Sequence, residues 1–236
     1  MQIIKPIDKT VSSESEIYSS LLSLKGANII ELGCGSGVTA RSIVKDFSTD
    51  SYIACEVDKH QHDKNVSSVD HSGIDFIYAG AESIPFEGSS FNVLLMFKSL
   101  HHVPTEKMGL AMAEIHRVLK LGGAAYISEP LYSGEFNDLV KIFHDEKEVR
   151  EAAFKAEKKA VEDGLFQLSS QHFFNVPREF AAFQDFEDKL INNTHTSHVL
   201  DDITYEKIKS RYFSKADNNG FARFYAPMRV DLLKKI

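Results

Sequence analysis

Three closely spaced glycines, Gly33, Gly35 and Gly37, constrain the fold of this chain more than any other feature. They directly follow a short apolar segment at 27–32, which has the length and composition of a buried strand. The next apolar side chains recur with the spacing of one helix face, at Ala40, Ile43, Val44 and Phe47. The sequence therefore predicts strand, glycine loop and helix, and glycine allows the loop backbone to approach a ligand closely.

Apolar runs that alternate with polar or helical connectors continue this pattern through the first half of the chain. The runs lie at 52–55, 74–78, 91–97 and 124–128. Such alternation predicts parallel strands joined by helical crossovers, and these sheets bind ligands outside the carboxyl ends of their strands. Before the last run, we expect a helix to end at Gly122 and Gly123, because glycine commonly terminates helices.

The alternation stops after Pro130. Beyond it we expect a helical insert at 131–165 and further helices at 178–213. Two closing strands are expected at 166–176 and 221–233. Pro227 lies inside the last strand and predicts a bulge or a poorly paired edge there. We therefore expect one α/β domain with a doubly wound, seven-stranded, mostly parallel sheet. Residues 1–130 would form its ligand-binding core, and the insert and later helices would cover the substrate.

Composition excludes several classes of partner. The 236 residues include 27 Lys and Arg against 34 Asp and Glu, a net charge of -7, so nucleic acid is not an expected partner. No apolar stretch approaches the roughly 18 residues of a membrane span, and the start lacks a secretory signal, so we expect a cytoplasmic protein without a membrane partner. Cys34 and Cys55 lie in apolar runs and suggest neither a disulfide framework nor a zinc ribbon.

The residues around the glycines indicate which ligand the loop accepts. Glu31 lies two residues before the first glycine, where its carboxylate would repel a diphosphate. The spacing G-x-G-x-G also differs from the G-x-G-x-x-G pattern that places a pyrophosphate on a helix N-terminus. A ligand that carries an ammonium and a sulfonium suits this loop better than a dinucleotide.

The segment 31–37, Glu-Leu-Gly-Cys-Gly-Ser-Gly, closely resembles the first motif of class I S-adenosylmethionine-dependent methyltransferases. Three later segments resemble motifs of the ubiquinone-biosynthesis-like (methyltransferase type 11) branch, in the same order: 80–86, 91–103 and 114–130. The specific resemblance covers residues 14–130, whereas 131–236 matches only in general plan. It implies a Rossmann-like methyltransferase fold, S-adenosyl-L-methionine as cofactor and S-adenosyl-L-homocysteine as product.

The resemblance also implies roles for individual residues. Glu31 would hold the methionine ammonium, and Glu56, at the end of the second strand, would accept both ribose hydroxyls, with Asp58 as the alternative. Ala81 and Glu82 would contact the adenine. The family's usual Asp is Gly80 here, so Glu82 or a backbone carbonyl would have to accept from the adenine amino group. The remaining predicted cofactor contacts are Gly33, Cys34, Gly35, Gly37, Val57, Met96 and Phe97, although core packing also explains the last two.

Two adjacent histidines are the candidates for catalysis. His101 and His102 follow the fourth strand on the ligand side, where an imidazole would orient a substrate hydroxyl or amine or take its proton. The competing interpretation is a packed residue bonded to backbone. Weaker candidates flank the same opening: Lys98, Glu129 and Tyr132. A metal site is not expected, because a solvated helix face and a polar loop account for the other acidic and histidine groups, at His144, Asp145, Glu146, His195 and His198.

These features favour a methyltransferase that acts on a small molecule, with carbon, oxygen or nitrogen as the acceptor atom. A non-catalytic S-adenosylmethionine-binding protein that engages a partner through its C-terminal half is the alternative from another class. The glycine spacing and Glu31 disfavour a nicotinamide-dependent dehydrogenase. Monomer and homodimer both remain open.

Overall fold

The structure of the chain is a computed structural model that describes residues 1–5, 10–68, 73–192 and 200–236. Within these ranges, one sheet contains β1 Asn28–Leu32, β2 Ser51–Glu56, β3 Asp75–Tyr78, β4 Phe91–Phe97, β5 Leu119–Pro130, β6 Phe166–Phe180 and β7 Ala222–Lys235. The α-helices are α1 Glu14–Leu21, α2 Val38–Asp46, α3 Lys59–Ser67, α4 Met108–Val118, α5 Gly134–Val140, α6 Lys147–Glu162, α7 Phe183–Phe186 and α8 Asp202–Phe213. None of the helices in the described ranges is long and apolar enough to cross a membrane.

The strand order confirms the predicted doubly wound, mostly parallel sheet. The order is β3-β2-β1-β4-β5-β7-β6, and β7 runs antiparallel to both of its neighbours. The first strand, β1, pairs in parallel with β2 on one side and with β4 on the other. The order reverses beside β1, and at such a switch point the loops that follow the strands diverge and leave a crevice for a ligand.

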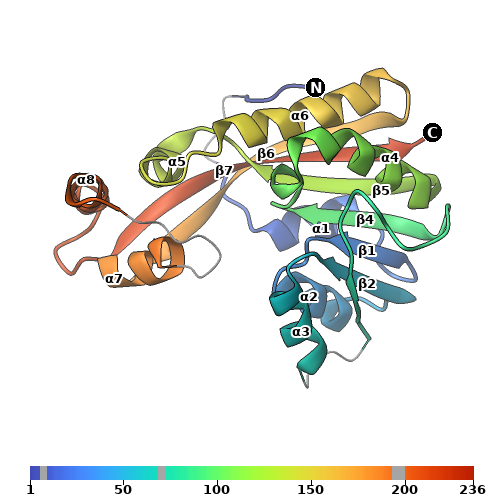
Figure 1. Ribbon diagram of the computed structural model, residues 1–236, viewed down its shortest axis with the longest axis horizontal. Helices are drawn as coiled ribbons and strands as arrows, with labels where there is room; N and C mark the ends of the chain where they lie inside the picture. Colours follow the sequence, from blue (N-terminus) through green and yellow to red (C-terminus); the bar gives the residue numbers. More distant parts are fainter. Residues whose placement is uncertain (6–9, 69–72, 193–199) are drawn as a thin grey trace.

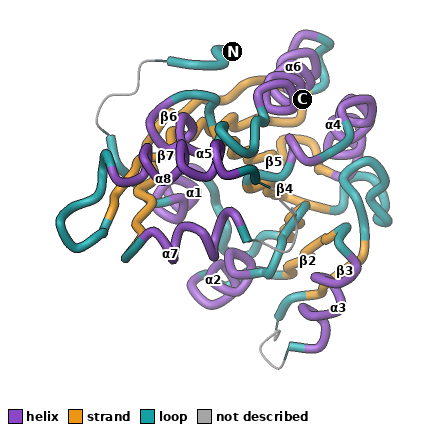
Figure 2. Tube along the Cα trace, turned by 60° about the vertical axis from the view of Figure 1, so that its left-hand side comes forward, coloured by secondary structure: helices purple, strands orange, loops and turns teal. Residues whose placement is uncertain are grey.

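Helices cover both faces of the sheet and create two apolar layers (Figures 1 and 2). On one face, α4 and α6 pack against β-strand side chains through residues such as Met112, Ile115 and Ala160. On the other face, α1 and α2 contribute Tyr18 and Ile43. These layers hold the parallel strands rigidly, so the loops at the carboxyl edge have fixed starting points.

The last two strands extend beyond the rest of the sheet. β5 pairs with β7 as far as Pro130 and Met228, whereas β6 and β7 remain paired to Phe180 and Ala222. Figure 1 shows α5, α7 and α8 around this projecting ribbon. They enclose a third apolar cluster that is rich in aromatic side chains, among them Phe180, Phe183, Phe186, Tyr212 and Phe224. The predicted closing strands therefore exist, but both are longer than expected, and 178–180 belongs to β6 instead of a helix.

The expectation that Pro227 marks an edge is wrong, because β7 lies between β5 and β6 and the edge strand is β6. The N–H of Leu131 donates to the Pro227 carbonyl at 2.9 Å, so the backbone of Pro227 faces the side of β5. In an antiparallel strand the N and the carbonyl of one residue face the same side. The missing N–H of Pro227 therefore faces Leu131, just past the end of β5, and the Leu131 carbonyl accepts from Arg150 Nη1 instead. The bulge lies in β6, between Leu168 and Ser170.

The helix expected to end at Gly122 and Gly123 ends earlier, at Val118. Leu119 already pairs with Phe91 as the first residue of β5, and the next pair is Val93 with Ala124. The intervening residues of β5 form a bulge, which requires a left-handed backbone at Gly122 (φ 75°). The two glycines therefore serve the strand and not the helix.

The insert expected at 131–165 contains two helices, α5 and α6, separated by residues 141–146. His144 and Glu146 lie in this connection and not on a solvated helix face, and the side chain of Glu146 is only 13% exposed. The connection lies close to the turn after β4, since Glu146 Oε1 is 3.7 Å from His101 Nε2.

Candidate active site

A cavity of about 1040 Å³ lies at the carboxyl ends of β1, β2 and β4. Ten of the predicted cofactor residues line it: Glu31, Gly33, Cys34, Gly35, Glu56, Val57, Ala81, Glu82, Met96 and Phe97. Gly37 does not line the cavity. It precedes α2 with a left-handed backbone (φ 72°), and a Cβ atom there would lie 2.9 Å from the Phe76 ring.

The glycine loop is held against the neighbouring strand ends. The N–H groups of Gly33 and Cys34 both donate to the Cys55 carbonyl at 2.9 Å, at the end of β2. Ser99 donates its hydroxyl to the Leu32 carbonyl at 2.8 Å, and a Cβ atom at position 33 would lie 2.6 Å from the Ser99 Cβ. Only glycine fits this approach, so the loop after β1 and the turn after β4 stay close together.

Glu56 connects the glycine loop to the end of β2. One carboxylate oxygen accepts from the Gly35 N–H at 2.7 Å, and the other accepts from Val57 and Asp58, each at 2.8 Å. A carboxylate has about four acceptor positions, so room remains for a ligand hydroxyl. Asp58 also lines the cavity, but its Oδ1 caps α3 by accepting from the N–H groups of His60 and Gln61. The geometry favours Glu56 over Asp58 for the ribose.

Glu31 lies at the bottom of the cavity and is 2% exposed. The Tyr52 hydroxyl donates to its Oε2 at 2.7 Å. Burial raises the pKa of Glu31 to about 7, and the Tyr52 hydrogen bond and the positive charge of Lys98 oppose this shift. A cationic group of a ligand would stabilise the charged carboxylate and lower this pKa again.

Glu82 occupies the space that the side chain of the family's Asp would need. A Cβ atom built on Gly80 would collide with the Glu82 carboxylate. Glu82 also forms an ion pair with Lys107 at 3.0 Å and lines the cavity. The Glu82 carboxylate therefore lies close to where the side chain of an acid at position 80 would be.

A second pocket, of about 210 Å³, adjoins the cavity, and we call it the inner pocket. Its lining comes from the turns after β4 and β5, from α5 and α6, and from the projecting ends of β6 and β7. The two spaces share five lining residues, Lys98, His102, Phe136, Val140 and Glu146. His101 lines only the inner pocket, so the two candidate histidines lie where the spaces meet.

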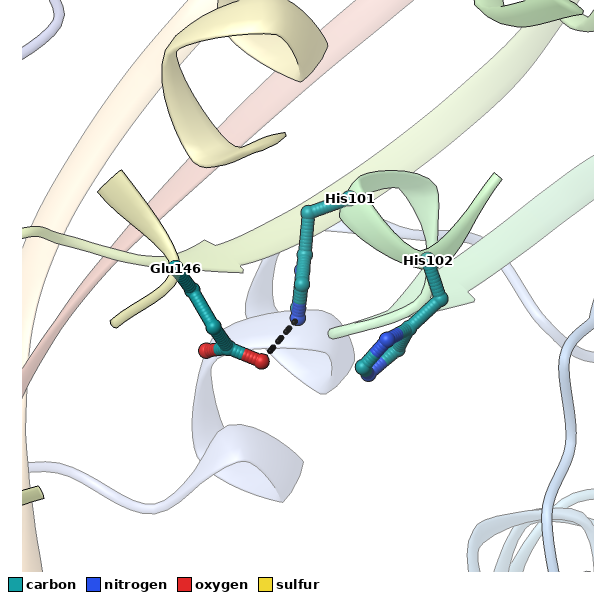
Figure 3. Close-up of side chains that lie close together, drawn as sticks. All are labelled: His101, His102 and Glu146. Carbon is teal, nitrogen blue, oxygen red and sulfur yellow. Dashed lines mark ion pairs between the residues drawn. The ribbon is translucent and has the colours of Figure 1, made fainter. Parts of the chain in front are cut away.

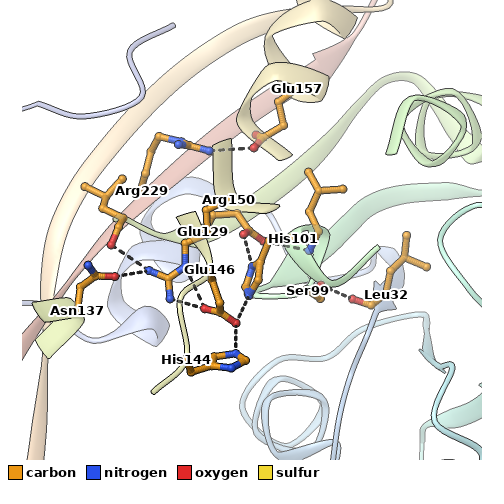
Figure 4. A network of polar contacts seen from close by, with 12 residues as sticks. Leu32, Ser99, His101, Glu129, Asn137, His144, Glu146, Arg150, Glu157 and Arg229 are labelled. Carbon is orange, nitrogen blue, oxygen red and sulfur yellow. Dashed lines mark hydrogen bonds and ion pairs between the residues drawn. The ribbon is translucent and has the colours of Figure 1, made fainter. Parts of the chain in front are cut away.

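His101 is 4% exposed and forms a close pair with Glu129 at the end of β5 (Figure 4). Its Nδ1 lies 2.5 Å from Glu129 Oε2, while Glu129 Oε1 accepts from the Leu100 N–H at 3.0 Å. The other ring nitrogen, Nε2, lies 3.7 Å from Glu146 Oε1. The ring is therefore not held by two backbone bonds, as the packed interpretation required. Carboxylates lie near both of its nitrogens.

Glu146 connects the insert to this pair. It accepts from Arg150 Nη2 at 2.5 Å and contacts His144 Nε2 at 2.8 Å. Arg150 in turn donates to the Leu131 carbonyl and the Asn137 side chain (Figure 4). Burial would raise the pKa of Glu146, but its interactions with His101, Arg150 and His144 outweigh burial and lower this pKa. The carboxylate is thus an anion at neutral pH.

His101, His102 and Glu146 also form a group whose potential metal ligand atoms lie within 4.8 Å of one another (Figure 3). Most of these atoms already contact other protein groups. Glu146 contacts Arg150 and His144, and His101 Nδ1 contacts Glu129. A metal ion would have to compete with a guanidinium for the same carboxylate. His195 and His198 lie outside the described residues.

Of the weaker candidates, Lys98 lines both spaces, and Glu129 lines neither but contacts His101. Tyr132 lines neither space and donates to Asp145. The sequence did not indicate two residues of the inner pocket, Glu146 and Arg178, as parts of a site. Each comes from the segment after residue 130, where no motif resemblance exists.

Comparison with known proteins identifies the fold and the domain. The chain superimposes on a putative methyltransferase from Bacillus halodurans C-125 with a TM-score of 0.67 at 16% identity, covering 95% of this chain and 99% of that one. A Bacillus subtilis protein, YcgJ, gives 0.66 at 18% identity, with 94% and 97% covered. Residues 29–123 match the family model of the methyltransferase domain. The chain thus has the fold of class I S-adenosylmethionine-dependent methyltransferases, and residues 29–123 match a methyltransferase domain.

Curated relatives of this methyltransferase domain act on different compounds. A rice 2-methyl-6-phytyl-1,4-hydroquinone methyltransferase is 29% identical over 136 residues, which cover 56% of this chain and 41% of the rice protein. A phthiotriol/phenolphthiotriol dimycocerosates methyltransferase of Mycobacterium ulcerans is 25% identical over 170 residues, 72% of this chain and 62% of that protein. The chain thus spans about two fifths of the rice relative. A [4+2]-cyclase shares the fold with a TM-score of 0.58 at 16% identity, covering 94% of this chain and 79% of the cyclase, so fold alone does not define the reaction.

We predict that Glu56→Ala weakens S-adenosylhomocysteine binding by about tenfold or more, because a charged hydrogen-bond acceptor is lost. Asp58→Ala is the matched control. It removes a helix cap, at a cost of about 1 kcal/mol in stability, and should leave affinity within about threefold. Isothermal titration calorimetry measures both dissociation constants. A larger loss for Asp58→Ala would assign the ribose to that residue.

The affinity for S-adenosylhomocysteine should rise about tenfold between about pH 6 and pH 8. With its pKa raised to about 7, Glu31 is partly protonated at the lower pH. The ammonium of the ligand favours the charged form, so binding releases a proton and strengthens until Glu31 is ionised in the free protein. Glu31→Gln should bind more weakly and with a flat pH profile. If the two profiles measured by calorimetry have the same slope, Glu31 is not the titrating group.

Proposed function

We propose that the protein transfers a methyl group from S-adenosylmethionine to a small molecule in the inner pocket. The observation that supports this most is the joining of two spaces beside His101 and His102. One space is lined by the residues that the family uses for the cofactor. The other is smaller, mainly apolar and fitted with a few polar groups, as small-molecule sites usually are. The names of the rice and mycobacterial relatives also favour a small-molecule acceptor.

The residues of the cavity fit the cofactor. S-adenosylmethionine, when bound, supplies a methyl carbon activated by its sulfonium. Glu31 would bind the ammonium, Glu56 the ribose hydroxyls and Glu82 the adenine edge. Carboxylates at all three places suit a cationic ligand and oppose a diphosphate, which argues against a dinucleotide.

His101 is the group best placed to take a proton from the acceptor. When Glu129 accepts an N–H bond from Nδ1, the lone pair of His101 resides on Nε2, which is the nitrogen toward Glu146. Carboxylates on both sides stabilise the imidazolium that forms when Nε2 takes a proton. Glu129 is thus a positioning residue in this proposal, and His101 is the catalytic base.

The test of the proposed function is ligand-dependent stabilisation. S-adenosylhomocysteine should raise the melting temperature, because a ligand that binds only the folded state stabilises it by mass action. NADH and ATP should have no comparable effect at the same concentration. Folded protein that gives no heat in calorimetry with millimolar S-adenosylhomocysteine would refute the proposal. Binding without any turnover, across a screen of acceptors monitored by S-adenosylhomocysteine release, would favour the non-catalytic alternative.

His101→Ala should leave S-adenosylhomocysteine affinity within about threefold and lower methyl transfer by roughly 10²–10⁴, the range for positioned acid–base groups. His172→Ala is the control, since that half-buried histidine on β6 bonds to Ser170 and lines neither space. Single-turnover rates with an acceptor from the screen provide the measurement. A lower melting temperature with an unchanged rate per folded molecule would make His101 a packing residue.

A further inference from the structure

Two cationic side chains face the inner pocket without an anionic partner among the described residues. Lys98 directly follows β4, and Arg178 lies near the end of β6, on the projecting ribbon. Within the described ranges, neither the Lys98 ammonium nor the Arg178 guanidinium forms a hydrogen bond or an ion pair. Arg178 Nε is fully buried and unpaired, and the guanidinium lies 6.0 Å from the centre of the Phe136 ring.

Arg150, in the same pocket, shows the contrast. Its guanidinium is saturated by Glu146, the Leu131 carbonyl and Asn137. The buried Nε of Arg178 has no such partner, and a charge away from bulk water is costly when unpaired. Lys98 is only partly enclosed, since the residue as a whole is exposed.

The carboxylates nearest to the two cations are engaged elsewhere. Glu129 accepts from Leu100 and contacts His101, and Glu31 accepts from Tyr52. Glu14 accepts from the Tyr126 hydroxyl at 2.6 Å. Burial lowers the pKa of Lys98, and the positive charge of Arg178 lowers it further, although these three carboxylates oppose the shift. The negative charges of these carboxylates thus stabilise the cations, but no carboxylate among the described residues forms an ion pair with Lys98 or Arg178.

The backbone holds Lys98 in position despite strain. Its φ is 55°, a left-handed value that is uncommon for a residue other than glycine. The Lys98 N–H donates to the Ser128 carbonyl at 2.7 Å, which ties this conformation to β5. Such strain persists where surrounding contacts impose it, and it is frequent at binding sites.

We propose that Lys98 and Arg178 bind an anionic group, a carboxylate or a phosphate, on the methyl acceptor. This inference rests on the proposed function, since it identifies the substrate class of that site. The rest of the pocket wall is apolar, with Phe136, Val140 and Met228. The acceptor is therefore a small apolar molecule with one acidic group, held with its reacting atom toward His101.

The carboxylate of the cofactor is the other source of an anion. Lys98 lines both spaces and lies within reach of either, whereas Arg178 lines only the inner pocket. If both cations bound the cofactor carboxylate, Arg178 would have to line the cofactor cavity, and it does not. The experiment below separates the two sources through the response of S-adenosylhomocysteine.

Calorimetry with three probes of similar shape tests the proposal: benzoate, phenyl phosphate and the neutral benzamide, each added to protein saturated with S-adenosylhomocysteine. Benzoate or phenyl phosphate should bind, and whichever binds more tightly identifies the anion. Benzamide should bind at least about tenfold more weakly, because it lacks the charge. If benzamide binds as well as both anions, the proposal is refuted.

Lys98→Met and Arg178→Met should each weaken binding of the favoured anion by about tenfold or more. Arg178→Met should leave S-adenosylhomocysteine affinity within about threefold, because Arg178 does not line the cofactor cavity. Neither should lower the melting temperature of the ligand-free protein, because each removes an unpaired charge, and a purely structural role predicts the opposite. Arg223→Met is the matched control, since Arg223 lies on the same ribbon, pairs with Glu179 and lines neither space. Arg178→Gln replaces the methionine variant if that variant does not fold.

Three results would overturn the inference. One is unchanged anion binding in Arg178→Met, and another is an equal loss in Arg223→Met. The third is a loss of S-adenosylhomocysteine affinity in Lys98→Met with anion binding intact, which would assign Lys98 to the cofactor. Failure of S-adenosylhomocysteine to bind the unmodified protein is a different result, because it refutes the proposed function itself.

Discussion

The parallel pairing of β1 with β2 and β4 is the constraint on which the rest of the site depends. It brings three carboxyl ends to one edge of the sheet, where Leu32 is level with Cys55. The Gly33 and Cys34 N–H groups then donate to the Cys55 carbonyl, and the Gly35 N–H donates to the Glu56 carboxylate, which joins the loops directly. Each of these contacts exists only because the strands run in the same direction at neighbouring positions. The cofactor cavity is therefore a consequence of strand order, with few residues needed to shape it.

A single buried carboxylate extends this arrangement toward the substrate side. Glu129 ends β5 and reaches across to the turn after β4, where it bonds to the backbone of Leu100 and to the ring of His101. Because both bonds use the same carboxylate, the turn and the imidazole are fixed together. This geometry orients one ring nitrogen away from the sheet and toward Glu146. The same acid thus ties the turn after β4 to β5 and sets the orientation of the His101 ring.

Apart from Lys98, His101 and His102, the inner pocket is lined by the part of the chain that the family model does not cover. The insert supplies Phe136, Glu146 and Arg150, and the projecting strands supply Arg178 and Met228. The match to the methyltransferase domain ends at residue 123, before all of these positions. In the proposed function, cofactor binding and acceptor choice would therefore depend largely on different segments of the chain.

The sequence by itself determined the elements whose signals are local. It predicted the glycine loop, the alternation of strands and helices, and the acids at Glu31 and Glu56. Each of these features depends on residues only a few positions apart. The ends of the elements were less certain: Gly122 fits a helix cap as well as a strand bulge, and only the pairing of Phe91 with Leu119 decides between them.

Tertiary structure alone decided the surroundings of the charged groups. Glu146 resembles a residue of a solvated helix face until the turn between α5 and α6 brings it beside His101. Lys98 and Arg178 are 80 positions apart in the sequence, and they share a pocket because β6 projects past β5. Whether a cation has a partner depends on contacts between distant segments, which no local pattern records. The sequence therefore determines which charged side chains the chain contains, and tertiary packing determines which of them are left without a protein partner and can contact a ligand.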